Sequence, residues 1–233
     1  MNTRYDVLLC DADNTIFDFN KAEENAFALT CAYMGFESSE TLLAVYDKIN
    51  KALWKLLEEG GITQSVLRVR RFEQFLEAIG KKELDAADMA REYAEQLGRQ
   101  SVPIDGAIKA IARWSRRLPV IIVTNGISRI QHGRMEGSEV RHYIRGMVIS
   151  EEVGVAKPDP KMLEIAMDMA GVKDRGRALM LGDSLSSDIA AAANAGVDAC
   201  WYNPRGMQNT KGLPVRYDIR SLDEVDAIIK GEN

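Results

Sequence analysis

The chain has 233 residues and a formal net charge of −5, with 46% hydrophobic and 28% charged residues. These proportions are typical of a globular protein with one large domain or a domain that carries a sizeable insertion. The acidic balance argues against a partner that is a nucleic acid polymer, because affinity for a phosphate backbone comes from concentrated lysine and arginine.

No run of about 18 apolar residues is present, so we expect no membrane span. The first ten residues, MNTRYDVLLC, lack the pattern of a signal peptide, and we therefore expect a cytoplasmic protein. The three cysteines, Cys10, Cys31 and Cys200, form no CxxC pair. The sequence thus suggests neither a zinc site nor a disulfide framework.

Five short apolar runs predict β-strands. Their hydrophobicity is continuous rather than alternating, which indicates strands buried on both faces. The runs are Tyr5–Cys10, Val120–Thr124, Gly146–Ser150, Ala178–Leu181 and Asp198–Tyr202. A short strand at 217–219 and a helix at Leu222–Ile229 are expected to follow them.

Helical periodicity over Ile104–Arg117, Pro160–Ala170 and Ser187–Ala195 alternates with these runs. Strands and helices that alternate at this spacing predict an α/β protein with a doubly wound, parallel, Rossmann-like sheet.

The interval between the first two strands breaks this alternation, because it is over a hundred residues long and carries only helical patterns. The patterns cover Ala22–Met34, Leu42–Glu59, Ser65–Ile79 and Asp85–Leu97. We therefore predict an α/β core made of residues 1–16 and 102–233, with a helical insertion at residues 17–101.

Polar side chains follow four of the predicted strands. Ligands bind beyond the carboxyl ends of the strands in an open α/β sheet, so these positions are candidates for a site. The residues are Asp11, Asp13, Thr124, Asn125, Lys157, Asp183 and Asp188. Each alone has an ordinary structural explanation, such as a turn, a helix cap or a solvated charge. Because all seven residues follow the ends of four predicted strands, we expect them to form one functional site.

Their chemistry favours phosphoryl transfer. The three carboxylates of Asp11, Asp13 and Asp183 suit a hard, oxygen-seeking cation, above all Mg²⁺. Lys157 and Thr124 suit the oxygens of a phosphate. One aspartate can attack phosphorus, and the other can protonate the leaving oxygen and then activate water. No P-loop, dinucleotide fingerprint or nucleophile elbow is present to support another chemistry.

Four motifs, taken in order, resemble those of the haloacid-dehalogenase-like hydrolase superfamily. They are DADNT at 11–15, TNG at 124–126, VAKPDP at 155–160 and GDSLSSD at 182–188. The helical insertion resembles the α-helical cap of that superfamily.

The resemblance implies a role for each matching residue. Asp11 would be the nucleophile, and Asp13 would be the general acid and base, with its backbone carbonyl directed at Mg²⁺. Thr124, Asn125 and Lys157 would bind the phosphoryl group. The two later aspartates complete the implied metal site, with Asp183 as a ligand and Asp188 as a neighbour that orients the site.

The second aspartate of the first motif, Asp13, distinguishes between the reactions that members of the superfamily catalyse. Dehalogenases of the superfamily resemble this pattern but lack it, because a halide leaving group needs no proton. The presence of Asp13 therefore implies a phosphatase or phosphomutase.

A closer resemblance concerns the substrate. The segments TNGISRIQHGRMEGSEVRHYI, VISEEVGVAKPDP, GGITQSVLRVRRFEQFL and CWYNP are similar to the pyrimidine 5′-nucleotidase branch. This implies a nucleoside monophosphate as the small-molecule partner. The cap would recognise its leaving group through Arg68, Arg70 or Arg71, and we select Arg71 because the adjacent Phe72 belongs to the apolar stripe. The alternative is a basic helix face exposed to solvent.

Two other functions stay open at this point. A sugar-phosphate phosphatase or a phosphomutase would share the same core. A phosphoacceptor signalling module also gathers acids, a hydroxyl and a lysine around Mg²⁺, but its acceptor follows an inner strand and it lacks so large a helical insertion. The sequence gives neither the preferred base or sugar nor the oligomeric state.

Overall fold

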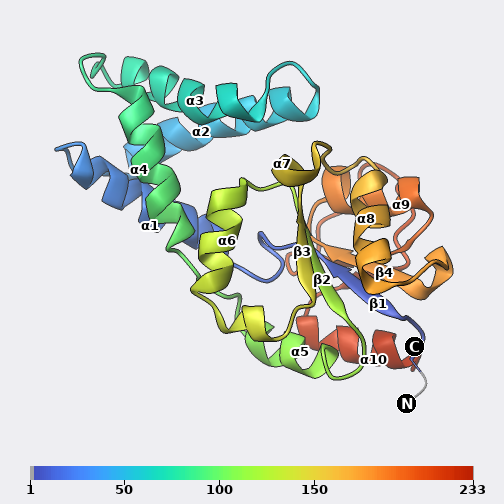
Figure 1. The fold of residues 1–233 in the computed structure, drawn as a ribbon. Helices are drawn as coiled ribbons and strands as arrows, with labels where there is room; N and C mark the ends of the chain where they lie inside the picture. Colours follow the sequence, from blue (N-terminus) through green and yellow to red (C-terminus); the bar gives the residue numbers. More distant parts are fainter. Residues whose placement is uncertain (1–2, 233) are drawn as a thin grey trace.

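A computed structural model describes residues 3–232 and contains a parallel sheet of six strands in the order β3-β2-β1-β4-β5-β6 (Figure 1). The strands are β1 (Val7–Cys10), β2 (Val120–Thr124), β3 (Gly146–Ile149), β4 (Ala178–Gly182), β5 (Asp198–Tyr202) and β6 (Tyr217–Ile219). All five predicted strands and the sixth short one are present, and the predicted doubly wound α/β class is confirmed. The predicted core was residues 1–16 and 102–233. Its first residue and its last residue lie outside the described range of 3–232.

The strand order places a topological switch point at the middle of the sheet. Strand β1 pairs with β2 on one side and with β4 on the other, and Leu9 is aligned with both Ile121 and Met180. From β1 the chain builds outward through β2 and β3, and then crosses back to β4, β5 and β6. The carboxyl ends of β1 and β4 therefore border the crevice where ligands bind in such sheets.

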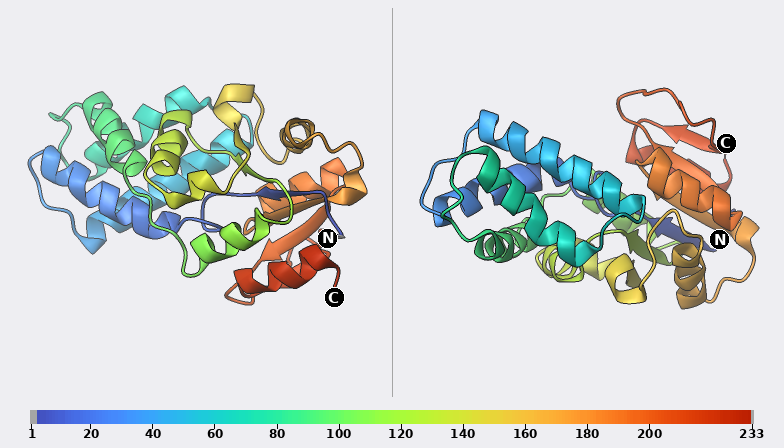
Figure 2. Two further views of the ribbon diagram at one scale, coloured as in Figure 1. Left: turned by 60° about the horizontal axis from the view of Figure 1, so that its bottom comes forward. Right: turned by 90° about the horizontal axis from the view of Figure 1, so that it is seen from above.

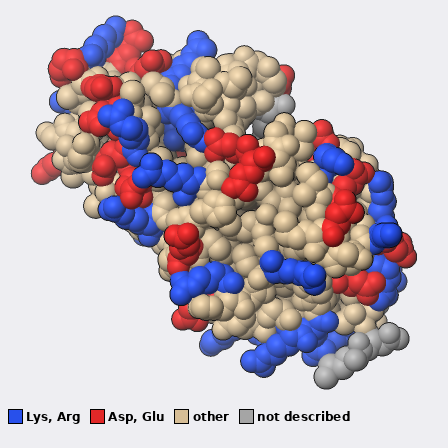
Figure 3. All heavy atoms as spheres, viewed as in Figure 1, with Lys and Arg blue, Asp and Glu red and all other residues tan. Residues whose placement is uncertain are grey.

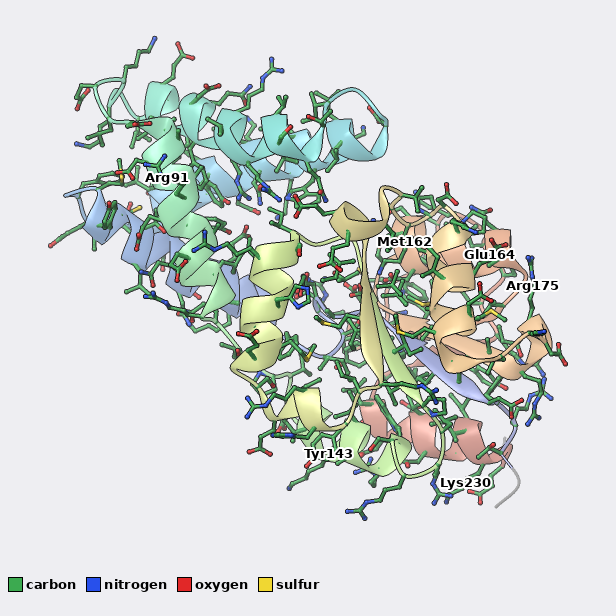
Figure 4. The ribbon with its side chains drawn as sticks, viewed as in Figure 1. Arg91, Tyr143, Met162, Glu164, Arg175 and Lys230 are labelled. Carbon is green, nitrogen blue, oxygen red and sulfur yellow. The ribbon has the colours of Figure 1, made fainter. Side chains whose placement is uncertain are left out.

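Helices cover both faces of the sheet. Helices α5 (Ala107–Trp114) and α10 (Val225–Lys230) pack on one face, and α8 (Lys161–Ala170) and α9 (Ala190–Ala195) pack on the other. On α8, Met162 is fully buried against the sheet, whereas Glu164 lies on the outer side and binds Arg175 (Figure 4). This double coverage explains why the strands are continuously apolar rather than alternating.

Two core helices were not predicted. Helix α6 (Ser128–Glu136) lies between β2 and β3, and a short α7 (Ser150–Val153) follows β3. The short 3₁₀ segments are Glu139–His142, Arg175–Arg177 and Leu222–Glu224, and a π-helical turn at Leu185–Ile189 precedes α9.

The predicted helical insertion, residues 17–101, contains four helices, which form the lobe at the upper left of Figure 1. They are α1 (Phe19–Tyr33), α2 (Glu40–Glu58), α3 (Gln64–Ala78) and α4 (Ala86–Gly98). Each begins at an aspartate, serine or threonine whose side chain accepts a hydrogen bond from the first turn. Inside the lobe the rings of Phe27, Tyr46, Phe72, Phe75 and Tyr93 form one aromatic cluster.

The lobe contacts the core at two separate places, which Figure 2 shows from two further sides. At the first, α4 packs on α6 so closely that a Cβ added to Gly133 would lie 2.9 Å from the carbonyl oxygen of Gly98. At the second, the start of α3 reaches the core, where Nε2 of Gln64 donates to Oγ of Ser150 at 3.3 Å. The space between the two contacts is therefore bordered by both the lobe and the strand ends.

Charges of both signs are interspersed over the face of the molecule drawn in Figure 3. Within the described range, none of the helices has the length and apolar character needed to cross a membrane.

Candidate active site

A cavity of about 900 Å³ lies between the lobe and the carboxyl ends of the strands. It is lined by all eight residues that the sequence analysis singled out, which are Asp11, Asp13, Arg71, Thr124, Asn125, Lys157, Asp183 and Asp188. Four separate segments of the core and one helix of the lobe contribute these side chains. The structure therefore brings the predicted residues to one place.

Asp11 and Lys157 form the buried centre of the site. Asp11 directly follows β1, and its backbone N–H continues the sheet by donating to Leu181 at 2.9 Å. Nζ of Lys157 donates to Oδ1 of Asp11 at 2.5 Å, to Oδ1 of Asp188 at 2.6 Å and to the carbonyl oxygen of Val123 at 2.6 Å. All three protons of the ammonium group are thus used, which fixes its position.

Asn125 holds the backbone of Lys157. Its Nδ2 donates to the carbonyl oxygen of Lys157 at 2.8 Å, and its Oδ1 accepts from the N–H of Lys157 at 2.7 Å. Thr124 is buried at the end of β2, and its Oγ1 accepts from the N–H of Gly126 at 3.1 Å. Because both ends of the Asn125 amide are engaged with Lys157, a phosphate contact by Asn125 would have to come from its backbone.

Asp183 and Asp188 lie beyond β4. Oδ2 of Asp188 accepts from the N–H of Ser184 at 3.0 Å, and its other oxygen binds Lys157. A Cβ added to Gly182 would lie 2.3 Å from the carboxylate of Asp188, so the last residue of β4 has to be glycine for this packing. Asp183 lines the cavity, and its backbone carbonyl accepts from Nε1 of Trp201 at 2.8 Å.

The buried carboxylates exceed the positive charge beside them. Oxygens of Asp11, Asp183 and Asp188 lie within 4.8 Å of one another, the one such metal-competent group found among residues 3–232. Burial raises the pKa of Asp183 to about 7, and the neighbouring Asp188 adds to this rise. Burial also raises the pKa of Asp11, and Lys157 opposes that rise.

For Lys157, burial lowers the pKa, but the carboxylates of Asp11 and Asp188 outweigh burial and leave the pKa above its usual range. One buried ammonium, which binds two of the three carboxylates, thus compensates only part of their negative charge. A hard divalent cation held by oxygen ligands would relieve the remaining repulsion, so the donor set fits Mg²⁺.

Asp13 points toward α6 instead of joining that cluster. Its Oδ2 accepts from Nε2 of Gln131 at 2.8 Å, and its Oδ1 forms an ion pair with Nη1 of Arg134. Gln131 is 2% exposed and Arg134 is fully buried. Neither residue was predicted from the sequence, although both contact the predicted acid and base.

A signal for α6 exists, but polar residues obscure it. The buried positions Ile127, Ile130, Gln131, Arg134 and Met135 have the spacing of one helical face. Two of these five buried residues are a glutamine and an arginine, whereas the buried face of a helix is expected to be apolar. The periodicity of hydrophobic residues therefore failed at the place where the helix carries functional side chains.

Arg71 is buried in the lobe and faces the cavity. It is 3% exposed, it lies over the ring of Tyr93 at 4.6 Å, and its Nη1 donates to Oδ1 of Asn50 at 3.3 Å. Oε1 of Glu23 accepts from Nδ2 of Asn50 at 2.9 Å and from the hydroxyl of Tyr93 at 3.2 Å. Glu23, Asn50 and Arg71, which we call the cap triad, all line the cavity.

The two other arginines that were considered for substrate recognition lie elsewhere. Arg68 forms an ion pair with Glu151 of α7, and Arg70 is exposed. An exposed basic helix face therefore describes Arg70 but not Arg71.

Comparisons with known proteins agree with this geometry. A family model described as haloacid dehalogenase-like hydrolase matches residues 5–196. The HAD-hydrolase YfnB of Bacillus subtilis is 33% identical over 230 residues, which cover 99% of this chain and 97% of YfnB. The pyrimidine 5′-nucleotidase YjjG of Escherichia coli is 31% identical and covers 97% of this chain, with 98% of its own length matched.

The pyrimidine 5′-nucleotidase PynA of Streptococcus pneumoniae is 33% identical over 95% of this chain and 93% of its own. A crystal structure of YfnB bound to magnesium superimposes with a TM-score of 0.90 at 32% identity, over 97% of this chain and 99% of that one. A 2-haloacid dehalogenase from Pseudomonas syringae shares the fold with a TM-score of 0.70 at 21% identity, over 98% of this chain and all of that one.

The family that the four motifs predicted is thereby confirmed, and so is the prediction of an enzyme. This chain belongs to the haloacid dehalogenase-like hydrolases.

Proposed function

We propose that this hydrolase is a Mg²⁺-dependent phosphatase that acts on pyrimidine nucleoside monophosphates through an aspartyl-phosphate intermediate. The observation that carries the proposal is the pair of carboxylates in one cavity, with Asp11 held by Lys157 and Asp13 held by α6. Hydrolysis of a phosphate ester through a covalent intermediate requires a nucleophile and a proton donor, and Asp11 and Asp13 can supply them.

In the first step, an oxygen of Asp11 attacks phosphorus and forms a new P–O bond. The bond between phosphorus and the ester oxygen breaks, and its electron pair leaves with that oxygen, which takes a proton from Asp13. In the second step, Asp13 removes a proton from water, the water oxygen attacks phosphorus, and inorganic phosphate leaves while the carboxylate of Asp11 is restored.

Charge stabilisation supports both steps. Lys157 would bind a transferring phosphoryl oxygen by exchanging one of its three present partners for it. The hydroxyl of Thr124 and the backbone of Asn125 would bind the phosphoryl oxygens as well. Mg²⁺ held by Asp11, Asp183 and the backbone carbonyl of Asp13, with Asp188 orienting the site, would neutralise the phosphate charge. Several contributions are needed, because phosphate-monoester hydrolysis calls for acceleration of up to ~10²¹. General acid–base catalysis supplies only about 10²–10⁴ of this.

The cap triad supports a leaving group that carries both hydrogen-bond donors and acceptors, as a pyrimidine base does. Glu23 offers acceptors and Arg71 offers donors, and Nε of Arg71 has no hydrogen-bond partner among the described residues. A site with buried polar groups rejects analogues that leave those groups unpaired. The names of YjjG and PynA agree with this chemistry. Residues 17–101 would act as the cap that excludes water during transfer.

The test is phosphate release with Mg²⁺ from pyrimidine and purine nucleoside monophosphates and from sugar phosphates. We expect many turnovers per chain, a preference for pyrimidine substrates, and no activity in Asp11→Asn. Acid-quenched protein should carry one phosphoryl group on the peptide that contains Asp11. A preference for sugar phosphates would refute the substrate, and a phosphorylated protein without turnover would indicate a phosphoacceptor module instead.

A further inference from the structure

Both oxygens of Asp13 are occupied by side chains of a single helix. Arg134 binds Oδ1 through an ion pair, and Gln131 donates to Oδ2 at 2.8 Å. The side chain of Asp13 is about one-quarter exposed, so it still faces the cavity while α6 holds it. Its orientation is therefore set by two residues that belong to none of the four sequence motifs.

Arg134 is itself fixed on several sides. Its Nε donates to the carbonyl oxygen of Gln100 at 3.2 Å, and its guanidinium lies 4.8 Å from the centre of the ring of Phe17. A buried charge without a partner costs several kcal/mol, and Asp13 is the carboxylate that pairs with Arg134 among residues 3–232. The guanidinium therefore keeps the Asp13 carboxylate in contact with it.

The backbone makes room for the second contact. A Cβ added to Gly126 would lie 2.2 Å from Nε2 of Gln131, so the glycine of the TNG motif leaves the space through which Gln131 reaches Asp13. The strand-end motif and α6 thus fit together around one hydrogen bond. Such a fit is expected where a catalytic carboxyl has to be held in a narrow range of positions.

We propose that Arg134 and Gln131 are positioning residues, which orient the carboxyl of Asp13 for proton transfer to the leaving oxygen. This inference rests on the proposed function, because it assigns Asp13 the role of acid and base. The competing explanation is structural. In that case Arg134 only joins α6 to the segment of Gln100, and its loss impairs every substrate equally.

The leaving group separates the two explanations. The 5′-oxygen of a nucleoside is strongly basic and needs a proton as it leaves, whereas nitrophenolate leaves without one. The assay measures release of the leaving group in the first turnover, with enzyme in excess, from uridine monophosphate and from p-nitrophenyl phosphate. The variants are Arg134→Gln, Arg134→Lys, Gln131→Ala and Asp13→Asn. The matched control is Arg129→Gln, an exposed arginine of α6 that pairs with Glu95.

We expect Arg134→Gln to slow release from uridine monophosphate about 10- to 100-fold. This is less than the about 10²–10⁴-fold that general acid–base catalysis supplies, because the variant misplaces the carboxyl of Asp13 without removing it. Release from p-nitrophenyl phosphate should change less than about threefold, as should both substrates in Arg129→Gln. Arg134→Lys should recover part of the lost rate. Gln131→Ala should also slow release from uridine monophosphate more than release from p-nitrophenyl phosphate, but by a smaller factor. Asp13→Asn combined with Arg134→Gln should be no slower than Asp13→Asn alone.

Equal losses on the two substrates, or losses that multiply in the double variant, would overturn the inference. If Arg134→Gln shows no cooperative thermal unfolding, Gln131→Ala decides the question by the same comparison. Failure of the proposed function would look different, because the unaltered protein would then release phosphate from no monoester or would prefer sugar phosphates to uridine monophosphate. The inference alone fails if the unaltered protein and Asp13→Asn behave as described and the α6 variants do not.

Discussion

Lys157 and Asp11 are separated by 146 positions in the sequence, yet Nζ of Lys157 lies 2.5 Å from Oδ1 of Asp11. The same ammonium group binds Asp188 and the end of β2. It therefore joins three strand ends, and it is the cation on which the buried charge of the site depends.

Lys157→Ala should both abolish activity and destabilise the metal-free protein. Removing one partner from a buried ion pair leaves an uncompensated charge and typically costs about 3–5 kcal/mol. In a chain of this size each 1 kcal/mol lowers Tm by about 2–4 °C. Differential scanning calorimetry in EDTA checks the loss, with exposed Lys161→Ala of α8 as the control. Equal Tm values for the two variants would show that the pair contributes nothing.

Asp183→Asn should stabilise the metal-free protein at high pH. The pKa of Asp183 is raised from 3.8 to about 7, so between these values the folded state binds more protons than the unfolded state. Its contribution to stability is therefore present at low pH and is lost as pH rises through about 7. We expect the variant to gain a few degrees in Tm at about pH 8, where about 1 kcal/mol corresponds to about 2–4 °C. The gain should shrink toward about pH 5.

Magnesium should reverse the order of the two Tm values, so that the unaltered protein becomes more stable than Asp183→Asn. At about pH 8, Mg²⁺ should raise the Tm of the unaltered protein, because ligands that bind only the folded state stabilise it. The same addition should leave Asp183→Asn nearly unchanged. A magnesium-dependent shift of equal size in both proteins would remove Asp183 from the metal site.

Arg71→Ala should raise KM for a pyrimidine nucleoside monophosphate far more than KM for p-nitrophenyl phosphate. The buried guanidinium belongs to the cap triad and faces the cavity, so its loss removes contacts to the leaving group and leaves the phosphate site intact. We expect a rise of about 10- to 150-fold, since a hydrogen bond to a charged group contributes about 1.5–3 kcal/mol and each 1.4 kcal/mol is a factor of ten. Arg70→Ala, in the adjacent exposed position, is the control, and equal effects on both substrates would contradict the assignment.

Gly182→Ala should impair the site although it removes no polar side chain. The new methyl group would lie 2.3 Å from the carboxylate of Asp188, so Asp188 has to move away from Lys157. We expect a loss of magnesium-dependent activity together with a lower Tm, since overpacking typically costs about 1–3 kcal/mol. Unchanged activity in the variant would mean that Asp188 is not needed where it lies.

The strand ends were predictable from the sequence because their signal is local. A continuous apolar run that stops at a polar residue marks the carboxyl end of a buried strand, and in a parallel sheet all such ends meet at one edge. This is why the positions of Asp11, Thr124 and Asp183 at strand ends were predictable from the sequence. Lys157 follows β3 at a distance of several residues, and its motif rather than its periodicity identified it.

Helix α6 was missed for a physical reason. Its buried face carries Gln131 and Arg134, and a polar residue on such a face contradicts the pattern from which helices are inferred. The compensation for burying them is Asp13, 118 and 121 positions away respectively. No local rule detects such a partner.

The sequence by itself determined the class of fold, the helical insertion and the set of strand-end residues, because these follow from periodicity and from polar residues at fixed places along the chain. Only the tertiary structure decided what each side chain contacts. It pairs Lys157 with Asp11 and Asp188, assigns Asp13 to Arg134 and Gln131, and gathers Glu23, Asn50 and Arg71 in the lobe. The reason is that burial and charge compensation depend on distances in space, which the order of residues does not specify.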